Sequence, residues 1–155
     1  MQFSKSTDYA LHALLYLGRT GRSHNVGIKQ ISAALGVSES YLSKIMSKLR
    51  QDGIVRAVPG VNGGYELARA AEHITFLEVI QVIEGRQQLF ECSNSTSQQH
   101  QLLAEEGSAS PSQHKRRPRH SGCLVEQVMN GAEQQLHDYL REHTIQSVLD
   151  KAFKK

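Results

Sequence analysis

The chain has 155 residues, 39% of them hydrophobic and 21% charged, and a formal net charge of +3. This size and composition predict one globular domain with an extension, and the positive charge permits an anionic partner. The N-terminal segment lacks the charged-then-apolar order of a signal peptide, and no stretch approaches the roughly 18 apolar residues of a membrane span. We therefore expect a cytoplasmic protein without membrane contact, whose two cysteines form no static disulfide.

Three helices are predicted in the first third of the chain. Thr7 is expected to cap the first helix, which ends at Gly18. A short second helix is followed by a tight turn at residues 36–38, and Ser38 is expected to cap a third helix that ends at Gly53. The third helix carries an inward apolar stripe at helical spacing, formed by Leu42, Ile45, Met46 and Leu49.

After the third helix the apolar period changes to two, which is typical of β-strands. Residues 54–58 (IVRAV) and 65–69 (YELAR) are predicted strands, and Asn62-Gly63 is a strong hairpin-turn signal. Gly63 and Gly64 are expected to adopt positive φ angles in the turn. The hairpin either closes the core or approaches DNA with its glycine-rich tip.

A fourth helix is predicted from about Thr75 to Glu84. The order helix, helix, helix, hairpin, helix predicts a mainly α fold with a small β-hairpin wing, a winged helix-turn-helix, over residues 1–91. In such a fold the third helix enters the DNA major groove, where hydroxyls contact base edges and basic side chains contact phosphates. The predicted DNA-binding residues are Ser38, Ser40, Tyr41, Ser43, Lys44, Lys48, Arg50, Arg56, Gly60, Asn62 and Gly63. The alternative is a solvated polar helix face without a ligand.

The remaining chain divides into two predicted segments. Residues 92–122 are rich in Ser and Gln and show little periodicity, which predicts a flexible loop flanked by cysteines. Residues 123–155 are predicted to form one long helix, from about Leu124 to Lys151, and a tail. A coiled-coil seam for a homodimer is predicted on this helix, at Val125, Met129, Ala132, Leu136 and Tyr139. The alternative is that the helix packs back on its own domain.

Four motifs together resemble the Rrf2 family of bacterial regulators: TDYALHALLYLG at residues 7–18, ISAALGVSESYLSKIMSKLRQDGIV at 31–55, GGYELAR at 63–69 and ITFLEVIQVIEG at 74–85. The resemblance covers residues 1–91, resumes at Gly122 and leaves 93–121 unmatched. It implies a DNA-binding transcriptional regulator that binds a near-palindromic operator in double-stranded DNA as a homodimer. We expect a repressor, and an activator is the alternative. Its long C-terminal helix is then expected to cross that of the partner.

One position departs from the family pattern. Many relatives carry an arginine before the wing-tip glycine, where it enters the minor groove, whereas this chain has Pro59 before Gly60. Minor-groove reading by the wing is therefore in doubt. Arg56 and Asn62 are the candidates to compensate.

The two cysteines are candidate sensor residues. Family members with an iron–sulfur cluster place three cysteines here, and this chain matches the first with Cys92 and the last with Cys123 but lacks the middle one. A three-cysteine cluster is thereby excluded, and an iron–sulfur cluster is not favoured. Asp8 and His12 share one helix face and match places that ligate iron in some members, so they are candidate metal ligands with the two cysteines. Further candidates for iron or zinc are His100, His114 and His120.

The sequence also permits thiol chemistry at the two cysteines and functions other than DNA binding. The basic run at residues 114–120 favours a reactive thiolate at Cys123, and the cysteines then form a reversible disulfide or react with electrophiles. The same run is alternatively a phosphate contact or merely solvated, and the cysteines are alternatively structural. An enzyme is not expected, because no nucleophile–base pattern or phosphate loop is present. A module that binds a protein partner, such as a metabolic enzyme, is the remaining alternative.

Overall fold

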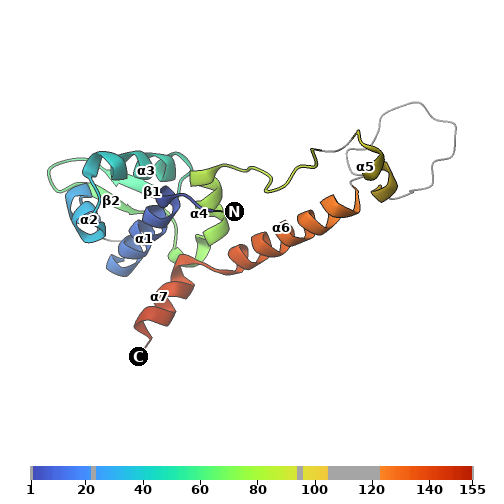
Figure 1. Cartoon of the computed structure of the whole chain (residues 1–155). Helices are drawn as coiled ribbons and strands as arrows, with labels where there is room; N and C mark the ends of the chain where they lie inside the picture. The colour runs from blue at the N-terminus through green and yellow to red at the C-terminus, as the bar shows by residue number, and fades with distance from the viewer. Residues whose placement is uncertain (1, 22–23, 94–95, 105–122, 155) are drawn as a thin grey trace. The chain divides into compact units, whose positions relative to one another are not determined.

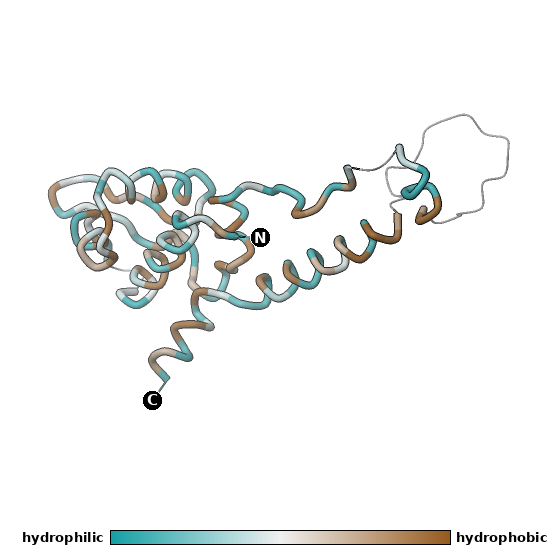
Figure 2. Tube along the Cα trace, viewed as in Figure 1, coloured by the Kyte–Doolittle hydropathy of each residue, from teal (hydrophilic) through white to brown (hydrophobic). Residues whose placement is uncertain are grey.

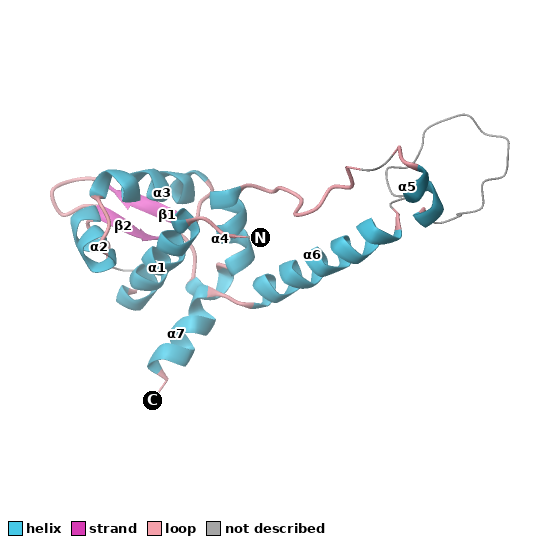
Figure 3. Ribbon diagram, viewed as in Figure 1, coloured by secondary structure: helices cyan, strands magenta, loops and turns pink. Residues whose placement is uncertain are grey.

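The computed structural model describes residues 2–21, 24–93, 96–104 and 123–154 (Figure 1). The chain divides into two compact units, one formed by residues 1–87 and 137–155 and the other by residues 88–136. The described residues form helices and a single two-stranded sheet (Figure 3). None of the described helices is long and apolar enough to cross a membrane.

The first unit contains most of the regular elements. In chain order they are α1 (Lys5–Thr20), α2 (Ile28–Leu35), α3 (Glu39–Gln51), β1 (Val55–Val58), β2 (Gly64–Leu67), the 3-10 helix η1 (Ala71–His73), α4 (Phe76–Glu84) and α7 (Ile145–Phe153). The second unit contains α5 (Gln98–Leu103) and most of α6 (Leu124–Glu142). The mainly α fold with a hairpin wing is as predicted, and the C-terminal helix α7 joins the first unit.

The helix-turn-helix is built by local signals that the sequence carries. Gly36 ends α2 in the left-handed conformation, with a φ of 67°, which glycine adopts without steric cost. The Ser38 hydroxyl caps α3 by accepting a hydrogen bond from the backbone N–H of Tyr41. The predicted inward stripe of α3 is confirmed, since all of its members are buried: Leu42, Ile45, Met46 and Leu49.

The bounds predicted for the first helix were wrong at both ends. Ser4, not Thr7, caps α1, and the helix continues through Gly18 to Thr20. Gly18 lies inside the helix, and a Cβ there would lie 2.8 Å from Cδ1 of Leu149 in α7. α1 therefore packs closely at Gly18 against a helix that is distant in sequence.

The hairpin pairs β1 with β2 in antiparallel register, from Val55 opposite Leu67 to Val58 opposite Gly64. The predicted positive φ angles at Gly63 and Gly64 were wrong, because the tip glycine with positive φ is Gly60, at 105°. Gly63 and Gly64 are instead sites of close backbone approach. A Cβ would lie 2.1 Å from the carbonyl oxygen of Val58 at Gly63 and 2.4 Å from that of Val26 at Gly64.

The prediction of one helix from Leu124 to Lys151 was wrong. α6 ends at Glu142, and Thr144 starts α7 with a capping box that includes Ser147. The break is held by main-chain pairing with the segment before α4, where the N–H of Ile145 donates to the carbonyl of Ile74 at 3.0 Å. α7 then packs on α1 and buries Ile145 and Leu149. Packing back on the same chain therefore applies to α7.

The segment predicted as a flexible loop, residues 92–122, contains a short helix. Ser97 caps α5 by accepting a hydrogen bond from the N–H of His100. After α5, Ala104 forms a single antiparallel bridge with Cys123, which directly precedes α6. The rest of the predicted loop, residues 94–95 and 105–122, lies outside the described residues, and so do His114, His120 and the basic run.

Candidate DNA interface and cysteine cluster

The exposed face of α3 lies opposite its buried stripe. At 3.6 residues per turn, positions 40, 44, 47 and 51 share this face. Ser40, Lys44 and Gln51 are exposed, and Ser47 is half-buried. Sequence reasoning selected Ser40 and Lys44 but missed Ser47 and Gln51, which the helical period alone indicates. The face combines hydroxyl, amide and ammonium groups, which suit base edges and phosphates.

Several predicted DNA-binding side chains at the start of α3 also have partners within the protein, and the hydroxyls of Ser38 and Ser40 lie 3.5 Å apart. The Ser38 hydroxyl accepts the hydrogen bond that caps the helix. The Tyr41 hydroxyl lies 2.7 Å from the Ser6 hydroxyl, and the Tyr41 ring packs edge-on against Tyr9 of α1 at a centroid distance of 5.8 Å. Tyr41 therefore ties the N-terminal end of α3 to α1, while 37% of its surface stays exposed. Its contact with a base remains a prediction.

The remaining polar side chains of α3 occupy its flanks. Ser43 is half-buried, and Lys48 and Arg50 are exposed. The hydrogen bond from Thr7, and next those from Ser4, hold the pKa of Glu84 below its usual range, and the positive charge of Lys48 adds to this effect. Lys48 lies on a flank of α3, whereas Lys44 lies on the open face.

The wing presents its tip to solvent. Gly60, Val61 and Asn62 are exposed, and Gly63 is half-buried. Arg56 forms an ion pair across the hairpin with Glu66, a residue that is buried. Because the guanidinium of Arg56 is engaged by this carboxylate, Asn62 is the better placed of the two candidates to compensate for the missing wing arginine.

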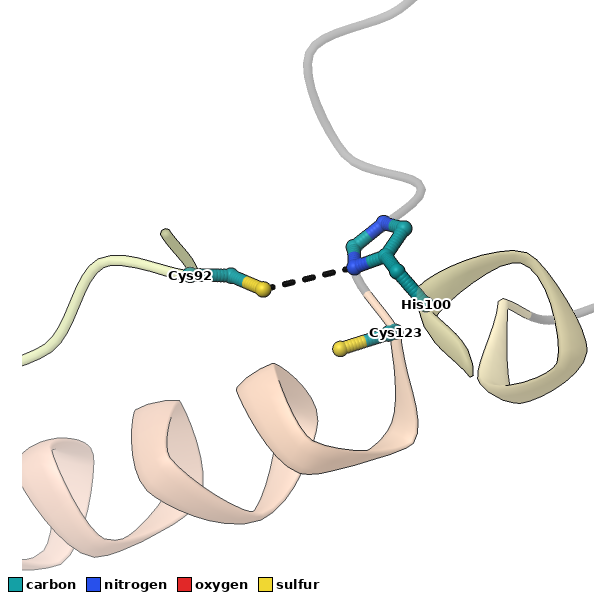
Figure 4. Close-up of side chains that lie close together, drawn as sticks. All are labelled: Cys92, His100 and Cys123. Atoms are coloured by element: carbon teal, nitrogen blue, oxygen red, sulfur yellow. Dashed lines mark hydrogen bonds between the residues drawn. The ribbon is translucent and has the colours of Figure 1, made fainter. Parts of the chain in front are cut away.

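The second unit brings three candidate metal ligands together. Cys92, His100 and Cys123 each offer one ligand atom, and these atoms all lie within 4.8 Å of one another (Figure 4). Sγ of Cys92 is 3.3 Å from Nδ1 of His100, and both cysteines are free thiols. Cys123 is buried, whereas Cys92 and His100 are half-buried. Thiolates and an imidazole are suitable ligands for iron or zinc.

The other two predicted metal ligands belong to the first unit. Asp8 and His12 form a pair on α1, with Oδ1 of Asp8 2.9 Å from Nδ1 of His12. Both side chains are more than half exposed. This geometry is that of an ordinary polar pair one helical turn apart. A metal site that combines Asp8 and His12 with the two cysteines remains a prediction.

The predicted dimer seam lies on the exposed surface of α6, where no residue is buried. Apolar residues recur along this helix (Figure 2). The exposed fraction is 47% for Val125, 41% for Met129 and 61% for Tyr139. Ala132 is also exposed, and Leu136 is half-buried. Exposed apolar side chains at seam spacing are what an uncovered coiled-coil surface presents.

The family model described as "Rrf2: Iron-dependent Transcriptional regulator" matches residues 3–151 of this chain. The chain belongs to the Rrf2 family. Its members here are transcriptional regulators, so this protein is a DNA-binding transcriptional regulator with a winged helix and not an enzyme. The thiol and imidazole cluster fits the iron named in the family description by the chemistry of its donor atoms.

Individual relatives agree with this assignment. The chain is 38% identical over 92 residues to the transcriptional regulator NsrR of Geobacillus kaustophilus, a match that covers 59% of this chain and 63% of that protein. It is 30% identical over 153 residues to the putative regulator YwgB of Bacillus subtilis, covering 97% of this chain and 86% of the relative. The chain thus spans less than two thirds of the NsrR sequence that it matches.

Solved structures show the same fold at low sequence identity. IscR of T. potens aligns with a TM-score of 0.68 at 21% identity, covering 98% of this chain and 88% of that one. CymR, the global cysteine regulator of B. subtilis, aligns with a TM-score of 0.65 at 21% identity, covering 96% of this chain and 95% of that one. At these identities the likeness concerns the fold alone.

Proposed function

We propose that this regulator acts in the cytoplasm as a homodimer, binds a near-palindromic operator and represses transcription, with its DNA affinity set by chemistry at Cys92 and Cys123. The observation that carries DNA binding is α3, which buries its entire apolar stripe and leaves Ser40, Lys44 and Gln51 exposed. A recognition helix needs this division, since one face must pack while the other enters the groove.

The proposal of a homodimer is supported by α6. Its apolar side chains at the predicted seam stay accessible in the single chain. A closed twofold pairing of two copies covers such a seam with an identical one. A twofold protein presents two recognition helices to half-sites about 34 Å apart, or one helical turn of DNA.

A footprint of the full-length protein on DNA upstream of its own gene tests the proposal. We expect two protected half-sites one helical turn apart, and weaker protection after oxidation or alkylation of the cysteines. Lys44→Glu is expected to abolish the footprint, because it places a negative charge against the phosphates. Lys151→Glu, which makes the same charge change at an exposed position of α7, is the matched control and should retain the footprint. Absence of a protected site, or equal affinity for random DNA, would contradict operator recognition.

A further inference from the structure

We propose that Cys92, His100 and Cys123 bind a single divalent ion, zinc or ferrous iron, in place of an iron–sulfur cluster. This inference builds on the proposed function, because it names the ligand of the cysteine site that we expect to control DNA affinity. All three residues belong to one compact unit.

The spacing of the ligand atoms fits one ion. A tetrahedral zinc ion with Zn–S bonds of about 2.3 Å and Zn–N bonds of about 2.0 Å sets its ligand atoms roughly 3.5–3.8 Å apart. The three atoms here lie within 4.8 Å of one another, and the Cys92 Sγ to His100 Nδ1 distance is 3.3 Å. Each ligand atom therefore needs to move by only a few tenths of an ångström to about an ångström to reach the spacing of ligands around one ion.

The same spacing does not suit a cluster. An iron–sulfur cluster takes four protein ligands and distributes them over different irons, which sulfide bridges hold apart. Ligands of different irons are consequently farther from each other than two ligands of one ion. Among the described residues the group has three ligand atoms, gathered around one point.

Local structure holds two of the ligands in place. His100 is the third residue of α5, and its backbone N–H donates to the capping hydroxyl of Ser97 at 3.0 Å. Cys123 directly precedes α6, and its carbonyl accepts a hydrogen bond of 3.0 Å from the N–H of Gln127. The bridge between Ala104 and Cys123 joins the end of α5 to the start of α6.

The donor set selects the class of ion. Two thiolates and one imidazole suit zinc and ferrous iron, whereas magnesium and calcium prefer oxygen ligands. Three protein ligands leave one tetrahedral position for water or an exchangeable ligand, which is the pattern of reactive zinc sites rather than of closed structural ones. The ion would join Cys92 to the start of α6, the helix that carries the predicted dimer seam. Loss of the ion would release that connection.

Cobalt titration of the full-length protein, purified reduced and metal-free, tests this proposal. We expect one Co²⁺ per chain, with the absorption of a tetrahedral thiolate site, and its displacement by Zn²⁺ or anaerobic Fe²⁺ at the same stoichiometry. Cys92→Ser, Cys123→Ser and His100→Ala should each weaken binding by more than about tenfold. His73→Ala, which removes an exposed histidine of the other unit, is the matched control and should leave cobalt binding unchanged.

Three results would overturn the single-ion site. They are the absence of stoichiometric cobalt binding, cobalt binding that His100→Ala leaves intact, and recovery of iron with acid-labile sulfide from protein purified without oxygen. Operator binding by the same preparations separates the two proposals. Protein that protects its operator but binds no cobalt overturns the ion site alone, whereas protein that binds cobalt but no operator overturns the proposed function.

Discussion

The carboxylate of Glu84, at the end of α4, accepts a hydrogen bond of 2.6 Å from the hydroxyl of Thr7 in the first turn of α1. The same oxygen accepts a second hydrogen bond of 2.6 Å from the backbone N–H of Ser4. A carboxylate at a helix N-terminus also interacts favourably with the helix dipole. These contacts connect α4 to α1, and Tyr41 in turn connects α1 to α3.

Glu84→Gln is expected to lower the free energy of unfolding by about 1 kcal/mol at neutral pH, because it weakens these charge-assisted hydrogen bonds. The pKa of Glu84 is lowered in the folded protein, so its contribution is complete above the usual carboxyl pKa and is lost as the pH falls through the lowered pKa. Urea unfolding at a series of pH values should therefore show the difference from wild type shrinking below about pH 4. Glu72→Gln, at an exposed glutamate, is the control and should change stability by less than about 0.5 kcal/mol. A difference that is independent of pH would contradict this role for the ionised carboxylate.

Gly64→Ala is expected to destabilise the protein by roughly 1–3 kcal/mol. Its Cβ would lie 2.4 Å from the carbonyl oxygen of Val26, so the pairing of Val26 with Tyr65 beside the wing must open. Gly131→Ala is the matched control, since a Cβ there meets no atom within 4 Å and alanine favours the helix by roughly 0.5–1 kcal/mol. Chemical denaturation gives the free energy of unfolding of both variants. Equal stability of the two would contradict the prediction that the close contact with Val26 excludes a side chain at Gly64.

Tyr41→Phe is expected to cost about 1 kcal/mol of stability, because it removes the hydrogen bond with Ser6 and keeps the ring against Tyr9. Ser6→Ala should lower the stability by a similar amount, and the double variant should lose less than the sum of the two single losses.

Tyr41→Ala is expected to weaken operator binding by roughly 1–3 kcal/mol while affecting random DNA less. Gel-shift titrations on both DNAs measure this, and an equal loss on each would rule out a specific base contact.

Met129→Asp is expected to dissociate the proposed homodimer, since it places a charge in the apolar seam of α6. Gln127→Asp adds the same charge two residues away, at a polar exposed position outside the seam, and should leave the dimer intact. Sedimentation equilibrium of the two variants provides the measurement. A monomeric wild-type protein, or a dimeric Met129→Asp variant, would refute the seam.

Much of the DNA-binding unit was predictable because its signals are local. Ser38 caps the helix that it precedes, Gly36 adopts the left-handed turn, and the α3 stripe repeats at the helical period, so each is visible in a few neighbouring residues. The dimer seam was likewise predicted from a helical repeat of apolar residues, and it stays a prediction. The sequence predicted the wing as a hairpin but not which of its glycines has a positive φ. A Cβ at Gly63 or Gly64 would instead meet backbone atoms of Val58 or Val26.

The sequence by itself determined the family, the order of α1, α2, α3, the hairpin and α4, and the polar face of α3, since caps, turns and periodicity act between neighbours along the chain. Only the tertiary structure decided where the last helix breaks, because the break at Thr144 depends on pairing with Thr75 and Ile74. It also brought one candidate histidine among the described residues, His100, to the cysteines. His100 was one candidate among several, and the capped helix α5 and the bridge from Ala104 to Cys123 bring it to them. Contacts between residues far apart in sequence leave no periodic trace, so they appear only when the chain is folded.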